Sequence, residues 1–284
     1  MIEEIEHKNF KRCLKISNGD AEVMISLDFG PRILSYALDG GENILGWHPE
    51  AAVNTELGTW KPYGGHRLWL APENMPRSYA PDNETVDYLV ETELSGLFTQ
   101  PGDKAGIEKQ IRVTLDEKGS GVSIEHKLKN VGSEPLEAAG WALTIMHPGG
   151  EVIIPNEPFA PYGLEHLLPV RSMGLWSYTD FTDPRWTFEK DAIRLRVDEN
   201  LGSQQKFGVL NRQGWAGYQW KDLSFVKRFA FVENAKYPDM NCNNEVYTAG
   251  GYVEIETLSP LRQLETGESI EYEETWELSQ NHLR

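Results

Sequence analysis

The sequence of 284 residues predicts an all-β protein, built as a large antiparallel β-sandwich. Many short runs alternate apolar and polar residues at intervals of about 8–12 residues, as the strands of half-buried sheets do. Turn-forming residues separate these runs, for example Asn18-Gly19 and Asp39-Gly40-Gly41. No stretch predicts a helix, and residues 165–170 and those near Ala51 come nearest to one. Because no repeat or linker interrupts the chain, we expect a single domain over residues 1–284.

The first half of the chain contains the clearest alternation. Val122, Ile124, His126 and Leu128 point to one face, while the polar residues between them point to the other. A histidine in an apolar row is more often a hydrogen-bonded core residue than a catalyst, so we interpret His126 as part of the core. The other strands predicted in this half cover residues 14–16, 23–27, 33–38, 111–115 and 136–146.

Two irregular segments, residues 47–83 and 156–191, interrupt the pattern. Proline, glycine and aromatic residues crowd together in the first of them. A loop of this length inside a compact domain is usually functional or forms a lid. Outside these segments, further strands are predicted at residues 151–154, 193–197, 207–210, 215–220 and 225–232.

A pair of strands at residues 252–258 and 270–278 closes the sequence. The first strand places Glu254 and Glu256 on one face, about 7 Å apart at the backbone. If this face lines a partly dry groove, repulsion and desolvation raise the pKa of at least one carboxyl group toward neutrality, as a general base requires. If the face is open to solvent, both residues are ordinary surface acids.

Composition limits the partners that the protein can have. Its formal net charge of −17 works against binding to nucleic acid or anionic lipid, which needs concentrated lysine and arginine, and favours a neutral or cationic ligand. The two cysteines, Cys13 and Cys242, cannot form a disulfide framework. The charged N-terminus lacks the apolar region of a signal peptide, and no apolar run is long enough to span a bilayer. We therefore expect a soluble cytoplasmic protein, as a monomer or homodimer.

The strong catalytic sequence motifs are absent. The chain has no phosphate-binding P-loop, no dinucleotide fingerprint, no H-E-x-x-H and no G-x-S-x-G. Its seven histidines show no close metal-ligand spacing. We expect neither a metal nor a cofactor.

A polar and aromatic run, GGHRLWLAPE, starts at residue 64 within the first irregular segment. His66, Arg67 and Glu73 have the polar groups to bind a polyhydroxylated ligand, while Trp69 or Trp60 offers a flat apolar face to its C–H groups. The alternative is an arginine–glutamate ion pair that holds the loop to the sheet.

His147 lies where the strand at residues 136–146 ends. An imidazole at a strand end is placed to act as a general acid. Because Pro148 follows directly, the commoner interpretation is an ordinary turn residue.

The order of these segments resembles the galactose mutarotase-like superfamily, which includes the aldose 1-epimerases and hexose-6-phosphate 1-epimerases. The similarity rests on Gly30-Pro31-Arg32-Ile33, on the Gly-Gly run YGGHRLWLAPE, on the turn Asn130-Val131-Gly132 and on the closing strands with Leu264-Glu265-Thr266-Gly267-Glu268 between them. It covers nearly the whole chain and is greatest to uncharacterised bacterial members.

The resemblance implies two proton transfers on a pyranose, one at the anomeric hydroxyl group and one at the ring oxygen. A glutamate takes the proton of the anomeric hydroxyl group and a histidine protonates the ring oxygen, so that the ring opens and closes as the other anomer. The glutamate corresponds to Glu256. Residues 142–144 and 82–88 contain no histidine at the places where the family has one, which leaves His66 or His147 as the acid.

The resemblance also implies that Arg67 grips sugar hydroxyl groups or a phosphate. Trp69, Glu73, Trp141 and Glu254 complete the predicted substrate-binding set.

Three functions are therefore open. The first is binding of a monosaccharide or small oligosaccharide with C1 epimerase activity, and the second is carbohydrate binding without catalysis. The third is a lyase or hydrolase on the same fold, for which Glu73 and Glu256 would form the carboxylate pair.

Overall fold

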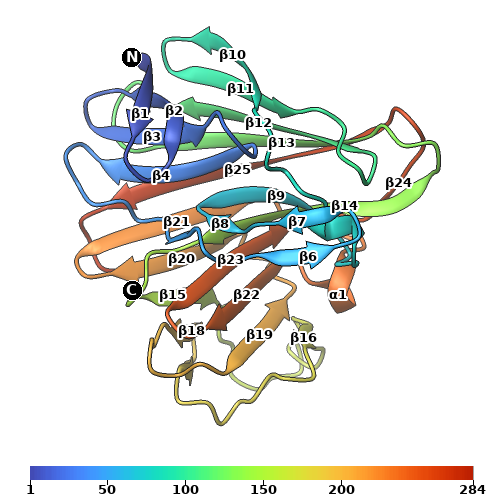
Figure 1. Ribbon diagram of the computed structural model, residues 1–284. Helices are drawn as coiled ribbons and strands as arrows, with labels where there is room; N and C mark the ends of the chain where they lie inside the picture. Colours follow the sequence, from blue (N-terminus) through green and yellow to red (C-terminus); the bar gives the residue numbers. More distant parts are fainter. Residues whose placement is uncertain (284) are drawn as a thin grey trace.

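In the computed structural model, which describes residues 1–283, two large antiparallel sheets pack face to face (Figure 1). The first sheet has eleven strands. Its order is β1 (Ile2–His7), β2 (Lys11–Ser17), β3 (Ala21–Ser26), β4 (Arg32–Leu38), β9 (His66–Ala71), β14 (Leu136–Ile145), β23 (Tyr252–Leu258), β22 (Asn244–Ala249), β19 (Gln204–Val209) and β16 (Met173–Leu175), with β24 (Arg262–Leu264) paired to β14.

The second sheet has ten strands. Their order is β10 (Asp87–Thr92), β11 (Ser95–Gln100), β12 (Ile107–Leu115), β13 (Val122–Asn130), β25 (Ser269–Ser279), β21 (Leu223–Phe229), β20 (Trp215–Trp220), β15 (Glu151–Pro155), β18 (Ala192–Arg196) and β17 (Trp186–Phe188). Two short ribbons, β5 (Trp47–His48) with β8 (Tyr63–Gly64) and β6 (Val53–Thr55) with β7 (Gly58–Trp60), lie outside these sheets. The helical structure within residues 1–283 is limited to η1 (Arg77–Tyr79) and α1 (Pro238–Asn241).

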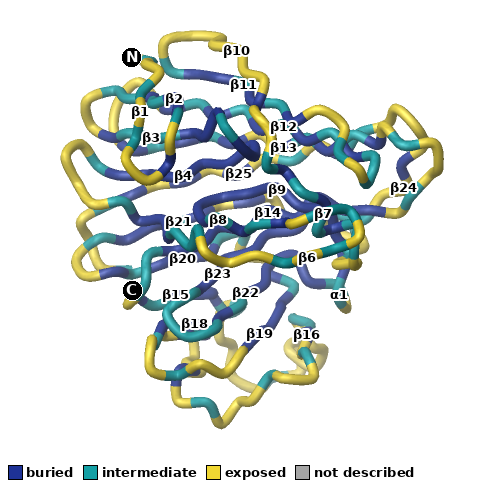
Figure 2. Tube along the Cα trace, in the orientation of Figure 1, coloured by how far each residue is buried: buried dark blue, intermediate teal, exposed yellow. Residues whose placement is uncertain are grey.

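The all-β antiparallel prediction is confirmed, and its physical basis is the alternation. Along β12 and β13 every second residue is buried, and the apolar ones among them join a cluster that draws side chains from both sheets (Figure 2). His126 is buried in this layer, as predicted. No helix within residues 1–283 is long and apolar enough to cross a membrane. The single domain stays a prediction.

The prediction of an irregular segment over residues 47–83 is wrong in part. Residues 66–71 do not belong to a loop but form β9, which lies between β4 and β14 in the centre of the eleven-stranded sheet. All six of its residues are buried, because side chains cover both faces of this strand. A strand buried on both faces lacks the apolar and polar alternation by which strands are detected in a sequence.

Candidate functional site

The two faces of β23 have opposite surroundings. Val253 and Ile255 belong to the apolar cluster between the sheets, whereas Glu254 and Glu256 point to the outer face of the eleven-stranded sheet. That outer face is not open to solvent, since Glu254 is 5% exposed and Glu256 is 0% exposed. The polar groove is therefore the alternative that the structure supports.

Strand register aligns a row of side chains across the sheet. Leu143 of β14 pairs with Arg67 of β9 on one side and with Glu256 of β23 on the other, and Glu256 pairs with Glu245 of β22. Directly paired residues share a face, so an arginine and two glutamates lie in one row.

Arg67, Leu143 and Glu256 of this row form part of the floor of a cavity of about 430 Å³, a size typical of small-molecule sites. The β5 and β6–β7 segments contribute to its walls, together with Tyr178 from the second irregular segment. The residues that line it are His48, Ala51, Val53, Trp60, Pro62, Arg67, Trp69, Glu73, Tyr79, Trp141, Leu143, Tyr178, Lys206, Tyr247, Ala249, Tyr252, Glu254 and Glu256.

Glu256 is held through one carboxylate oxygen only. Its Oε2 accepts hydrogen bonds from Trp141 Nε1 at 2.9 Å and from Lys206 Nζ at 3.0 Å. Its Oε1 has no hydrogen-bond partner among residues 1–283. Burial raises the pKa of Glu256, and the ammonium group of Lys206 opposes that rise. A fixed carboxylate with one free oxygen and a raised pKa has the properties of a general base.

Lys206 connects this carboxylate to a second one. Its Nζ lies 2.9 Å from Glu245 Oε2, and it stands over the rings of Trp141 and Trp176, 4.7 Å from each centroid. Burial raises the pKa of Glu245 well above its ordinary value, while the same ammonium group opposes the shift. The sequence did not point to Lys206, because a lone lysine in a strand is normally solvated.

Arg67 and Glu254 form a second buried ion pair. Arg67 Nη2 lies 2.7 Å from Glu254 Oε1, which also accepts a hydrogen bond of 2.7 Å from the hydroxyl group of Tyr252. Arg67 therefore pairs with Glu254 and not with Glu73, which instead accepts a hydrogen bond from Tyr79. The Nε and Nη1 atoms of Arg67 have no partner within the described part of the chain.

Tryptophan rings form an aromatic wall of the cavity. The ring of Trp69 is 4.8 Å from that of Trp60 and 5.3 Å from that of Trp141, and the guanidinium group of Arg67 lies 4.7 Å from the centroid of Trp69. The indole N–H groups of Trp60 and Trp69 have no acceptor among residues 1–283. Flat apolar surfaces with free polar edges suit a ligand that carries both C–H and hydroxyl groups.

Six of the eight predicted site residues thus lie around one cavity, whereas the two histidines do not. His66 neighbours Arg67 on β9 and therefore points to the opposite face, into the layer between the sheets, where it is 0% exposed. Burial lowers its pKa well below the ordinary value, so its imidazole is neutral at neutral pH. The expectation that His66 is the acid opposite Glu256 needs correction for this reason.

His147 is also outside the cavity. Its ring lies 3.9 Å from that of Trp220, and its Nδ1 is 2.8 Å from the carbonyl oxygen of Pro148. It belongs to the turn after β14, which was the alternative interpretation of this residue. The expectation that His147 is the acid opposite Glu256 needs the same correction, because His147 does not line the cavity.

His48 is the histidine that does line the cavity. Its ring stands edge-on to Tyr252 at 4.7 Å, and its Nε2 is buried without a partner within residues 1–283. Burial lowers the pKa of His48, and Glu254 opposes that shift. The sequence contained one indirect signal for His48, its position in an irregular segment expected to be functional.

No family model matches the sequence, and no curated protein matches it. Solved structures, however, share its fold. A TPR-domain containing protein from Parabacteroides distasonis matches 96% of this chain with 12% identity and a TM-score of 0.65; the chain spans only 48% of that protein's length.

A putative mutarotase from Salmonella typhimurium matches with a TM-score of 0.60 and 12% identity, over 98% of this chain and 93% of the other. A galactose mutarotase-like protein from Lactobacillus casei matches with a TM-score of 0.57 and 11% identity, over 94% and 100%. The chain therefore has the galactose mutarotase-like fold. At such low identity the similarity concerns the fold alone.

Proposed function

We propose that this protein binds a monosaccharide in the cavity above β9, β14 and β23, and that it interconverts the two anomers of that sugar as an aldose 1-epimerase. The observation that carries the proposal is the state of Glu256. Trp141 and Lys206 hold one carboxylate oxygen of this buried residue, while its other oxygen has no partner among residues 1–283.

The chemistry requires a base at the anomeric hydroxyl group and an acid at the ring oxygen. Glu256 Oε1 takes the hydroxyl proton, and its raised pKa increases its strength as a base. As the electrons of that O–H bond form the carbonyl group, the C1–O5 bond breaks and O5 takes a proton. Rotation about C1–C2 and closure of the ring give the other anomer, and each proton returns.

His48 is the proposed acid, because it lines the cavity and its Nε2 is free of protein partners among the described residues. A lowered pKa for the acid and a raised pKa for the base bring the two limbs of the pH profile closer together. The active ionic form has His48 protonated and Glu256 ionised, so these opposed shifts narrow the expected pH optimum.

The other cavity residues are assigned to binding. The indole faces of Trp60 and Trp69 accept the C–H side of a pyranose, while the free N–H groups of Arg67 and the indoles serve as donors to its hydroxyl groups. Both cations of the cavity, Arg67 and Lys206, are already paired with carboxylates. This pairing favours an uncharged sugar over a phosphorylated one.

A second function, carbohydrate binding without catalysis, is favoured by one observation. Neither His66 nor His147 lines the cavity, so catalysis depends on His48 alone among the histidines that the structure describes.

Two-dimensional exchange NMR over a panel of aldoses tests both functions. Catalysis predicts anomeric exchange that is faster than the buffer rate and falls by about 10²–10⁴-fold in Glu256→Gln, with sugar binding retained. The control variant is Glu277→Gln, which changes an exposed carboxylate on β25. Binding without any exchange supports the second function, and the absence of both refutes the assignment of this cavity.

A further inference from the structure

A cluster of metal-binding side chains lies in the layer between the two sheets, on the opposite face of β9 from the cavity. Its members are His66 of β9, His126 of β13 and Glu274 of β25, so both sheets contribute. One ligand atom from each lies within 4.8 Å of the others, and none of the three is more than 1% exposed. Their chemistry, two imidazoles and one carboxylate, is that of a zinc site.

The two imidazole rings face each other through their Nε2 atoms, which share a hydrogen bond. His66 Nε2 lies 2.8 Å from His126 Nε2, and on its other side His66 Nδ1 lies 2.9 Å from the hydroxyl oxygen of Thr144. A hydrogen bond at the far nitrogen helps to fix the ring orientation, as it does for most histidine ligands of metals. The ring of His126 is fixed by stacking on Tyr272, at 4.6 Å between centroids.

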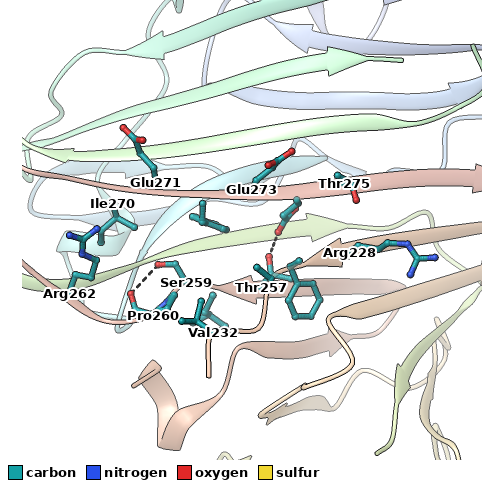
Figure 3. A pocket seen from close by; sticks show the side chains of 15 residues that line it. Arg228, Val232, Thr257, Ser259, Pro260, Arg262, Ile270, Glu271, Glu273 and Thr275 are labelled. Atoms are coloured by element: carbon teal, nitrogen blue, oxygen red, sulfur yellow. Dashed lines mark hydrogen bonds between the residues drawn. The ribbon is translucent and has the colours of Figure 1, made fainter. Parts of the chain in front are cut away.

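A second cavity, of about 520 Å³, borders the cluster at Glu274. It lies beside the end of β23, where Thr257 and Ser259 line it (Figure 3). Glu274 and Tyr272 are also among its lining residues. The hydroxyl group of Thr257 donates a hydrogen bond to Glu274 Oε1 there, and Trp276 Nε1 donates one of 3.2 Å to Oε2. The cavity thus borders the cluster at Glu274, which is itself only 1% exposed.

We propose that His66, His126 and Glu274 bind a divalent cation of the zinc class, which ties the two sheets together. Two nitrogens at about 2.0–2.1 Å from a tetrahedral ion are roughly 3.3 Å apart, so the imidazoles need to separate by about half an ångström. Three protein ligands leave the fourth position for a water molecule. The sequence did not indicate this site, because its ligands come from three strands that are distant in the chain.

Lys227 competes with the metal for the charge of Glu274. It is 0% exposed, and its Nζ lies 3.1 Å from Glu274 Oε1, so an ammonium cation already occupies this side of the carboxylate. Repulsion between this ammonium group and a divalent ion weakens metal binding. Removing the amine should therefore strengthen metal binding and make the stability of the fold depend on the metal.

The test uses the full-length protein without a polyhistidine tag, stripped with a chelator and titrated with Zn²⁺ and Co²⁺. We expect one equivalent of Zn²⁺ per chain by calorimetry and elemental analysis, a higher Tm, and a Co²⁺ absorption spectrum typical of tetrahedral coordination. In His126→Gln, Zn²⁺ affinity should fall at least 100-fold. In His166→Ala, the control in an exposed loop, it should be unchanged.

The Lys227→Met variant provides a second test in case His126→Gln fails to fold. Its Tm should fall without metal and recover with Zn²⁺, with at least tenfold tighter binding than in the wild type. The proposal is overturned if the wild type binds no Zn²⁺ or Co²⁺, if His126→Gln binds them equally well, or if metal leaves the Tm of Lys227→Met unchanged. Each of these results is independent of sugar binding in the other cavity.

Discussion

Replacing Lys206 with methionine removes the cation that lies between Glu245 and Glu256. The lysine is about as long as methionine, so the change chiefly deletes charge and hydrogen bonds. Its Nζ lies 2.9 Å from one carboxylate and 3.0 Å from the other, in surroundings where its side chain is 5% exposed. The variant therefore leaves two buried carboxyl groups without their shared counter-ion.

Breaking a buried ion pair by removing one partner costs about 3–5 kcal/mol, because the other charge remains buried and uncompensated. Burial already raises the pKa of Glu245 and Glu256 in the folded protein. Ionising such groups costs stability at a pH above their unfolded-state pKa of about 4.3, and Lys206 offsets this cost. Without Lys206 the pKa of each carboxyl group rises further, so the variant should lose the most stability near pH 8.

Lys206 itself does not titrate in this range. Its pKa is raised well above the ordinary value, so its contribution is present in full below about pH 10 and is lost only as the pH rises through its folded-state pKa. The difference between wild type and Lys206→Met should therefore shrink between pH 8 and pH 5, as the raised carboxyl groups take up protons. Urea denaturation at both pH values measures it.

The matched control is Lys221→Met. Lys221 lies 2.8 Å from Glu42, but both side chains are more than half exposed, so the expected loss is about 0–1 kcal/mol at either pH. The reasoning is refuted if Lys206→Met costs no more than this control, or if its cost is the same at pH 5 and pH 8.

Two further predictions concern the proposed proton transfer. Trp141→Phe removes an N–H donor that lowers the pKa of Glu256, so the acid limb of the kcat/KM profile for anomeric exchange should move to higher pH; an unmoved limb would rule out Glu256 as the group that sets it. His48→Asn should reduce kcat for exchange by about 10²–10⁴-fold, whereas His147→Asn should leave it unchanged, and equal activity of all three proteins would remove His48 as the acid.

A residue of the site could be predicted where its signal lies within one continuous stretch of sequence. That Glu254 and Glu256 share a face follows from the alternation along one strand, and the aromatic run with Arg67 and Trp69 is continuous in sequence. Lys206 was missed because only the pairing of β19, β22 and β23 brings it to Glu256. Successive residues of β9 also point to opposite faces, so His66 points away from the cavity that Arg67 faces. This consequence follows only once residues 66–71 form a strand.

The sequence by itself determined the all-β class, because half-buried strands have a period of two residues that needs no knowledge of their partners. It also determined that Glu256 shares a face with Glu254. Only the tertiary structure decided that this face is covered, that Arg67 pairs with Glu254, and that His48 joins the cavity while His66 joins the layer between the sheets. Pairing between strands that are distant in sequence sets these features, and burial and charge compensation follow from that pairing.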